Sequence, residues 1–369
     1  MRGFLISAML WLGLSAAPSA AQPVDDGPSV EARESEPYFR IGVTSENDGT
    51  FLKPWGATDR HYTNGFGATV TWQSQTTKDV LDAFLPKSDG AAFGLGFGHE
   101  IHTPNDLLAN PPDPDDRPYA GYLFGSAFVQ RQVNRDRFDH FDGLRVDVGL
   151  VGPSAHAKGV QVAIHDTFDG DDPKGWDDQL RDEFAFQVQY QRKLRFDTGS
   201  FDLFGIPLDT QAVPLAEINV GTVRRDLGGS LMYRFGVRLP DDFGPDQFRD
   251  PQSLTGDPFA HARGVALDPL FDQKLGRGGV FNAYGFLRAG LRYVEWSTFL
   301  DGNYERDPGP GVSKEPLVGE FEVGVVVGYV RGTNSFELAY STTWLTDQFQ
   351  SQSIQNSVGA LSVRWTLAF

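Results

Sequence analysis

The 369-residue sequence contains no cysteine, which excludes disulfide bonds, thiolate catalysis and zinc sites built on cysteine. Beyond its first residues it also lacks any run of about 18 apolar residues, the length that a membrane-spanning helix needs. Positive charge is scarce, since 32 Lys and Arg stand against 49 Asp and Glu, for a net charge of −17. So acidic a chain would repel nucleic acid and suits divalent cations better. Carboxylates, histidines and hydroxyls therefore remain to carry any chemistry.

The first 21 residues have the features of a secretory signal. Arg2 is followed by apolar residues from Phe4 to Leu14, and then by small residues up to Ala21, after which we expect cleavage. Removal of Arg2, the one charged residue in this segment, changes the net charge from −17 to −18. Residues 22–36 are polar and are expected to be disordered. An exported chain without a helical span can still cross a membrane as a closed barrel.

The last nine residues, 361–369, alternate apolar with small or polar residues and end on Phe369. Strand side chains alternate between two faces, so odd positions would meet lipid and even positions the lumen. A soluble edge strand can show the same alternation. The secretory signal favours a Gram-negative outer-membrane barrel, which would need the barrel-assembly machinery during biogenesis. The 13% of aromatic residues and the mean hydropathy of −0.33 fit this class.

Alternating segments predict an all-β fold, an antiparallel transmembrane barrel that forms a single domain over residues 37–369. The twelve predicted strands are 38–46, 61–73, 91–102, 118–131, 142–152, 181–194, 210–223, 228–238, 279–297, 318–331, 335–347 and 357–369. With both termini in the periplasm, the extracellular loops are 47–60, 103–117, 153–180, 224–227, 298–317 and 348–356. Residues 239–278 would form a long periplasmic connection, either a folded lobe or a sign that the strand count is wrong there.

Oxygen-bearing side chains gather at the outer ends of the first two predicted strands. Adjacent antiparallel strands would place Asn47 and Asp48 close to Thr63 and Asn64. Calcium prefers six to eight oxygen ligands, which Asp, Asn and main-chain carbonyls can supply. Asn-Asp-Gly and Thr-Asn-Gly are also common turn formers, so a purely structural role for these residues stays open.

The third extracellular loop contains His165 near the end of a short predicted helix, with Asp171 six residues further on. A histidine paired with a carboxylate can activate water, because the carboxylate orients the imidazole and stabilises its charged form. A single loop histidine can equally be solvated or structural. The other six histidines lack this loop setting with acidic neighbours: His61, His99, His102, His140, His156 and His261.

Six segments, in order along nearly the whole chain, resemble the outer-membrane lipid A 3'-O-deacylase family. They are Glu46–Asp48, Asp59–Gly65, Asp115–Gly121, Val151–Ala155, His165 together with Gly175–Gln179, and Leu239–Pro245. The resemblance implies a twelve-stranded barrel that removes the 3'-linked acyloxyacyl chain of lipid A, the membrane anchor of lipopolysaccharide, by calcium-dependent ester hydrolysis.

The same resemblance assigns roles to individual residues. Asn47, Asp48, Thr63, His165 and Asp171 match the active-site set of the family. His165 would deprotonate water and Asp171 would orient it, at a position where the family more often has Glu. A Ca²⁺ ion held near Asp48 and Asn47 would stabilise the oxyanion, and Thr63 would position substrate or water.

The chain departs from the family in the second extracellular loop. Residues 105–108 read Asn-Asp-Leu-Leu, where a branch of the family has a basic cluster suited to the phosphates of lipid A. Arg60 and Arg117 lie near in sequence, although Arg117 belongs to an acidic turn. The reaction class is therefore better specified than the substrate.

Two other functions remain possible from the sequence. An outer-membrane phospholipase would need a nucleophilic Ser with a His partner, and the only near pair, Ser154 with His156, has the sequence of a turn. A non-catalytic barrel, either porin-like or an inactive family member, is the other alternative. A porin needs an open lumen, whereas a twelve-stranded barrel can be filled by its own side chains.

Overall fold

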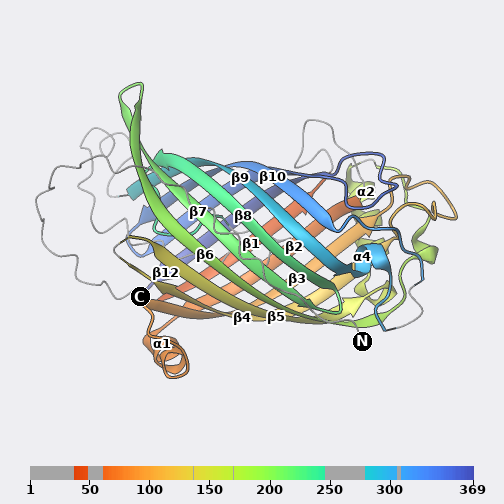
Figure 1. The fold of residues 1–369 in the computed structure, drawn as a ribbon, viewed down its shortest axis with the longest axis horizontal. Coiled ribbons are helices and arrows are strands. Elements are labelled where there is room, and N and C mark those ends of the chain that lie inside the picture. The colour runs from red at the N-terminus through yellow and green to blue at the C-terminus, as the bar shows by residue number, and fades with distance from the viewer. Residues whose placement is uncertain (1–36, 49–60, 136, 169, 246–278, 306–308) are drawn as a thin grey trace, which may run out of the picture. The chain divides into compact units, whose positions relative to one another are not determined.

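The computed structural model describes residues 37–48, 61–135, 137–168, 170–245, 279–305 and 309–369. Their twelve strands form one closed antiparallel barrel in which β1 pairs with β12 (Figure 1). The fold class and the number of strands predicted from the alternation are therefore confirmed. The predicted signal segment 1–21 and the polar segment 22–36 lie outside the described residues.

The strands tilt across the barrel and each pairs with its neighbours in sequence. They are β1 (Tyr38–Asn47), β2 (His61–Gln73), β3 (Gly90–Thr103), β4 (Ala120–Val133), β5 (Asp139–Val151), β6 (Glu183–Leu203), β7 (Ile206–Gly221), β8 (Arg224–Val237), β9 (Gly279–Ser297), β10 (Leu317–Arg331), β11 (Asn334–Leu345) and β12 (Ser357–Ala368). The helices are α1 (Gln75–Asp82), α2 (Ala157–Phe168) and α4 (Thr298–Asp301), with short 3-10 turns at Pro153–Ala155 and Trp176–Asp178. None of the helices in these ranges is long and apolar enough to cross a membrane.

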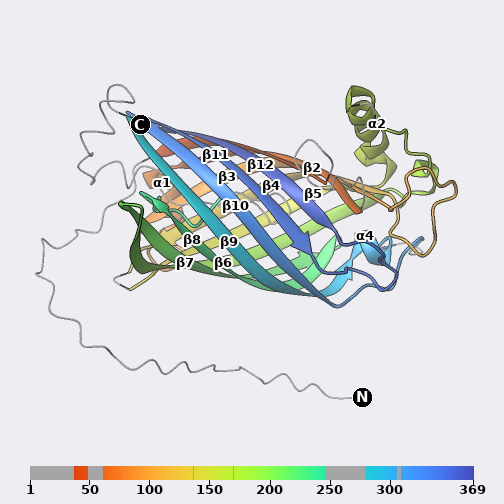
Figure 2. The same ribbon diagram turned by 90° about the horizontal axis from the view of Figure 1, so that it is seen from above.

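The two ends of the barrel differ. At one end, here named the inner end, the connections are mostly tight, α1 lies outside the wall, and the Phe369 amide donates to the Pro37 carbonyl (3.1 Å). The other end, here named the outer end, carries the long connections with α2 and α4 (Figure 2). In outer-membrane barrels, short turns face the periplasm and long loops face the exterior. The orientation expected from the sequence follows from this asymmetry.

The alternation of the strands separates a lipid-facing surface from the lumen. In β6, Phe184 and Phe186 are exposed on the outside, while Gln187 and Gln189 are buried inside. The closing strand β12 follows the predicted parity, because even positions from Ser362 to Ala368 are buried and odd positions are not.

The chain that follows β8 packs into the lumen at the inner end. We name residues 239–245 the plug. Leu239 and Phe243 join a buried cluster with Phe128, Phe141, Val213, Met232, Tyr284, Phe286, Val326 and Ala339. Asp242 forms ion pairs with Arg234 and with Arg364 (3.3 Å to the latter). This part of the expected periplasmic connection thus lies inside the barrel, and residues 246–278 lie outside the described residues.

Strands β6 to β8 differ from their predicted limits. Residues 224–227, expected as an extracellular loop, belong to β8, and the turn lies at 222–223 instead. At the inner end, β6 and β7 continue to a two-residue turn at Phe204 and Gly205, with φ of 54° and 82°. Positive φ at both central residues is the geometry of a tight hairpin turn that suits the twist of paired strands. Residues 197–200 are polar and were not predicted as part of a strand. In the structure their main chain pairs with β7, so they belong to β6.

Candidate active site at the outer end

The outer ends of β1 and β2 bring Asn47, Asp48 and Thr63 together, as their positions on adjacent strands predicted. Asn47 is paired with Asn64 in the strand register. The Asn47 side-chain amide donates to the Thr63 carbonyl (3.0 Å), and the Asp48 main-chain amide donates to the same oxygen (3.4 Å). A bulge in β2 at Thr63 interrupts the pairing with β3. Bulges re-aim side chains locally, and here the Thr63 and Thr103 hydroxyls lie 2.6 Å apart.

These residues form a buried group of oxygen atoms. Asp48, Thr63 and Thr103 are each at most 2% exposed. One carboxylate, one amide oxygen and two hydroxyls match the hard oxygen ligands that calcium takes, so the donor set fits such a cation. Among the described ranges, no cluster of three or more His, Asp or Glu is arranged to hold a metal. The rest of a calcium coordination shell would thus need water, substrate or other parts of the chain.

Helix α2 is held at the outer end by an apolar anchor at its beginning. Ala157 packs in a buried cluster with Ile101, Tyr119 and Trp176. The Trp176 indole donates to the Gln161 side-chain oxygen (2.8 Å), and Gly175 permits Tyr119 to approach closely, because an added Cβ would lie 2.5 Å from its ring. The segment Gly175–Gln179 therefore has a structural role in placing α2.

His165 lies in the last turn of α2 and is 5% exposed. Its ring Nδ1 is hydrogen-bonded to the main-chain carbonyl of Asp171, and the Gly170 amide donates to the His165 carbonyl (2.9 Å). A carbonyl only accepts, so Nδ1 carries the proton and the lone pair of the neutral ring is on Nε2. The orienting group seen in the structure is thus the carbonyl of Asp171, while its side chain is exposed.

The two parts of the candidate site both border β3, α2 through its anchored beginning and the oxygen group through Thr103. Helix α2 contacts β3 and β4, and Thr103 at the end of β3 contacts Thr63. Residues 105–108, which have no basic side chain, contribute apolar groups to this region. Leu107 packs on the anchor of α2, and Leu108 is exposed. Arg60 lies outside the described residues.

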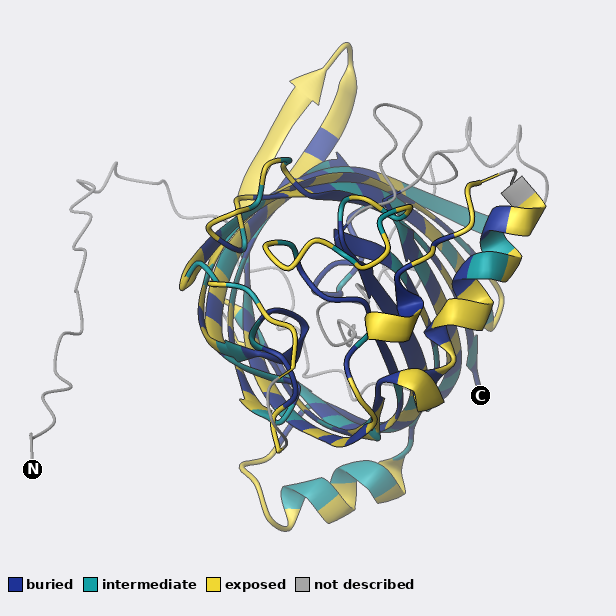
Figure 3. Ribbon diagram, turned by 90° about the vertical axis from the view of Figure 1, so that its right-hand side faces the viewer, coloured by how far each residue is buried: buried dark blue, intermediate teal, exposed yellow. Residues whose placement is uncertain are grey.

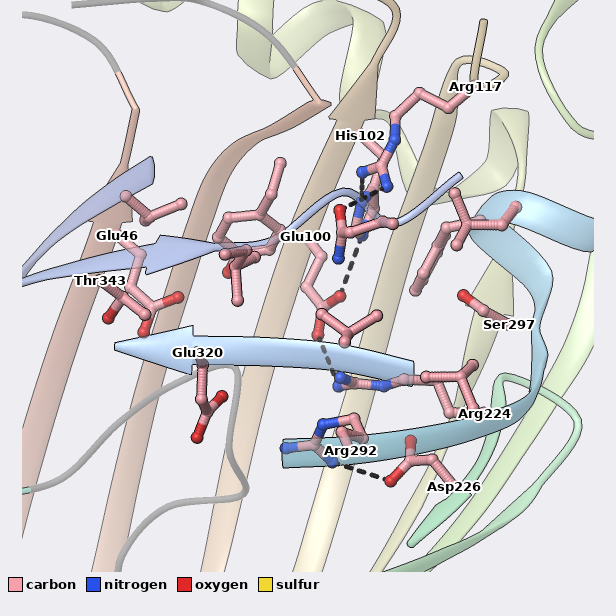
Figure 4. A pocket seen from close by; sticks show the side chains of 18 of the residues that line it. Glu46, Glu100, His102, Arg117, Arg224, Asp226, Arg292, Ser297, Glu320 and Thr343 are labelled. Carbon is pink, nitrogen blue, oxygen red and sulfur yellow. Dashed lines mark hydrogen bonds and ion pairs between the residues drawn. The ribbon is translucent and has the colours of Figure 1, made fainter. Parts of the chain in front are cut away.

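A second polar cluster lies in the outer part of the lumen and lines a pocket (Figure 4). The His102 Nε2 lies 3.1 Å from a Glu100 carboxylate oxygen, and Arg117 donates to the His102 Nδ1 (3.4 Å). Arg117 also donates to the Gln348 side-chain oxygen (2.9 Å), and Arg224 lies 3.9 Å from Glu100. Burial lowers the pKa of Arg117 to about 10, against the opposing effect of Asp116.

The pair Glu100 and His102 was not predicted as part of a site, because only histidines in loops with acidic neighbours were expected to be functional. Glu100 and His102 are two residues apart in β3, and strand alternation places such residues on one face. This spacing of two residues was the feature of the sequence that could have predicted the pair. The ring of His102 also stacks on Phe299 from α4, with centroids 3.7 Å apart, a contact that no local pattern indicates.

The segment Val151–Ala155, which the resemblance singled out, has a structural role. The Ser154 hydroxyl donates to Asp182 (2.9 Å), and its amide donates to the same carboxylate (2.6 Å). Gly152 adopts φ of 104° in this turn, against the backbone of Arg181. Ser154 is therefore a turn residue, as predicted, and gives no support to a serine nucleophile.

Comparisons with known proteins extend over nearly the whole chain. The model of the family described as Outer membrane protein LpxR matches residues 5–367. LpxR from Salmonella typhimurium has a similar structure, at 17% identity and a TM-score of 0.58, with 89% of this chain and 100% of that chain covered. The β domain of the Bordetella autotransporter BrkA matches at 12% identity and a TM-score of 0.42, with 91% and 100% covered. No curated protein sequence matches the chain. The structural likeness to the Salmonella protein is one of fold.

Proposed function

Because the chain belongs to the LpxR family of Gram-negative outer-membrane proteins, we propose that it is a lipid A 3'-O-deacylase. It would hydrolyse the ester that joins the acyloxyacyl chain to the 3' position of lipid A. The observation that carries this proposal is the orientation of His165 by the hydrogen bond between its Nδ1 and the Asp171 carbonyl, at the end of the barrel with the long connections. This bond leaves Nε2 as the atom that can accept a proton.

In the proposed reaction His165 acts as the general base. Its Nε2 takes a proton from a water molecule, and the water oxygen attacks the carbonyl carbon of the ester. The bond to the 3' oxygen breaks as the imidazolium returns the proton to that oxygen. The products are a sugar hydroxyl and an acyloxyacyl acid. Burial of the ring under residues 170–171 keeps it in one orientation throughout.

The buried oxygen group at the ends of β1 and β2 supports a cation role. Asp48 and Asn47 would hold Ca²⁺, with the Thr63 hydroxyl close by to position substrate or water. A bound calcium ion would polarise the ester carbonyl and stabilise the oxyanion. Asp48 is the one carboxylate in this group and would contribute most of the charge.

The substrate is proposed as an acylated sugar lipid, without a claim about its phosphates. Asn105 to Leu108 present no cation, and the exposed Leu108 and Val160 suit acyl chains near α2. The alternatives are less well supported. The plug fills the inner part of the lumen, which disfavours a porin, and Ser154 is bonded to Asp182 rather than to a histidine.

Mass spectrometry of lipid A tests the proposal. Cells that lack the activity would receive either the native gene or the His165→Gln variant. We expect loss of the 3'-linked acyloxyacyl mass only with the native protein, at equal amounts of folded barrel in both membranes. Identical lipid A from the two strains, with the native protein folded and calcium present, would contradict the proposed function.

A further inference from the structure

The inner end of the barrel carries a hairpin that extends beyond its neighbours. Pairing of β5 with β6 ends at Asp139 and Arg195, and pairing of β7 with β8 ends at Asp209 and Gly236. Residues 196–208 are therefore a two-stranded projection, which we name the hairpin arm. In Figure 1 it rises away from the long axis of the barrel, and in Figure 3 it reaches outside the barrel wall.

One face of the hairpin arm is apolar and continues the lipid-facing surface. In β7 the even positions face lipid, as the exposed Ile218 and Val220 show, and Ile206 has the same parity. Its register partner is Leu203, and on the same face the exposed Phe201 pairs with Leu208, which is itself buried. The turn residue Phe204 is 97% exposed.

The bulge in β6 makes this face continuous. Above it, the lipid-facing residues of β6 are at even positions, such as Phe186 and Tyr190. The register shifts by one residue between Asp197 and Gly199, so below the bulge the odd positions Phe201 and Leu203 take over the outward face. Without the shift, Ser200 and Asp202 would face outward.

The opposite face of the arm is polar. Ser200 pairs with Asp209, and Asp202 pairs with Pro207. In β7, Asp209 has the parity of the lumen-facing Gln211, so this face continues the lumen side of the wall. Because the arm bends away from the barrel axis, its outward face turns toward the membrane and its lumen-side face turns toward the periplasm.

We propose that the hairpin arm lies on the inner leaflet of the outer membrane. Phe201, Leu203, Phe204 and Ile206 insert among the phospholipid chains, and Asp202 and Asp209 remain in water. The occupant of this surface is lipid, because the apolar face is an extension of the surface that lipid already covers on β6 and β7. Amphipathic elements with one apolar face bind membrane interfaces in this way.

The absence of cysteine allows a direct test. Leu203→Cys and Ser200→Cys would each carry one nitroxide label in the full-length protein, reconstituted into phosphatidylethanolamine–phosphatidylglycerol vesicles. The two positions lie on the same strand and on opposite faces. Electron paramagnetic resonance would measure collision of each label with oxygen, which concentrates in lipid, and with a water-soluble nickel chelate.

For each label, the collision rate with oxygen is divided by the collision rate with the nickel chelate. We expect this ratio to be several-fold higher for the label at 203 than for the label at 200, at every lipid-to-protein ratio. Two outcomes would overturn the proposal. Equal nickel accessibility of both labels would place the arm in water. Protection of the label at 203 from both reagents, increasing as lipid is diluted by protein, would indicate a second copy as the occupant. Heat-modifiable migration of both variants would confirm that the barrel is folded.

Discussion

At the scale of the residue, the orientation of His165 by a main-chain carbonyl changes what mutations should do. His165→Gln should lower the deacylation rate by about 10²- to 10⁴-fold, because it removes the general base. Asp171→Asn should keep most of the activity, since the carbonyl that bonds Nδ1 is unchanged. Rates of lipid A hydrolysis by purified protein would measure both. If Asp171→Asn is as inactive as His165→Gln, the carboxylate itself orients the ring.

The carboxylate of Asp48 should matter for cation dependence. Asp48→Asn keeps the shape of the side chain but removes its charge, so we expect loss of activity and of calcium stimulation with the barrel still folded. Asp79→Asn is the matched control, because this exposed carboxylate lies on α1 at the inner end of the barrel, where it accepts a hydrogen bond from Gln75 (2.8 Å). Activity would be titrated with calcium after treatment with a chelator. Native activity that resists the chelator would remove calcium from the proposal.

Asp242 should make the plug sensitive to acid. Burial alone would raise the pKa of Asp242, but the Arg234 and Arg364 guanidinium groups lower it below its ordinary value. An Asp with a lowered pKa stabilises the fold above the unfolded value, about 3.9, and this contribution is lost as pH falls through the folded pKa. The ion pairs should therefore hold at neutral pH and weaken only below about pH 3.9.

Removing the charge tests this. Asp242→Asn leaves the fully buried Arg234 without its carboxylate, while Arg364 keeps its ion pair with Glu337. Removing one partner of a buried ion pair typically costs about 3–5 kcal/mol. Denaturant unfolding, followed by tryptophan fluorescence at pH 7 and pH 3, should show a lower midpoint for the variant at pH 7 and a smaller difference at pH 3. A constant difference between the proteins at both pH values would show that Asp242 acts through packing alone.

At the scale of the element, the end of α2 and the turn after it hold the general base. A Cβ at Gly170 would lie 3.0 Å from the ring of His165, whereas a Cβ at Gly159 in the same helix would contact nothing within 4 Å. Gly170→Ala should therefore displace the ring of His165. We expect it to lower kcat and to change KM only slightly. Gly159→Ala should leave both unchanged. Equal kinetics for the two variants would mean that the turn adapts without moving the ring.

The elements also show how far sequence reasoning extends. The helix was predicted from its apolar spacing at 160–164, and β1 and β2 from their alternation, because these signals are local. The ends of β6 and β7 were missed because a bulge reverses the parity at Asp197 and breaks the pattern. The plug was missed for a different reason. Asp242 pairs with Arg234 of β8 and with Arg364, which is 122 residues away in the chain, and no periodic spacing reveals these pairings.

At the scale of the whole molecule, closure of the barrel rests on the C-terminal strand. The Phe369 amide bonds to Pro37 at the start of the chain's barrel segment, and its ring is exposed to the membrane side. Deleting Phe369 should sharply reduce the heat-modifiable protein in the outer membrane, since it removes the bond to Pro37 and shortens the strand that closes the barrel. Phe84→Ala, which changes an equally exposed ring after α1, is the control. Normal insertion of the deletion variant would make the terminal residue dispensable.

The closed architecture was predictable as a whole because most strands keep a period of two, and because β1 begins and β12 ends at the same end of the barrel. The grouping of Asn47, Asp48 and Thr63 followed from the same rule of antiparallel neighbours. The luminal cluster around Glu100 and His102 needs the tilt of the strands and the placement of α4, which emerge only when the barrel closes.

The plug has a consequence for the cell as well as for the fold. Leu239, Phe243 and the ion pairs of Asp242 occupy the inner part of the lumen. The pocket near Arg117 lies in the outer part of the lumen. An occupied lumen should conduct few ions, so we expect that many copies of the protein can be embedded in the outer membrane without raising its permeability to toxic solutes.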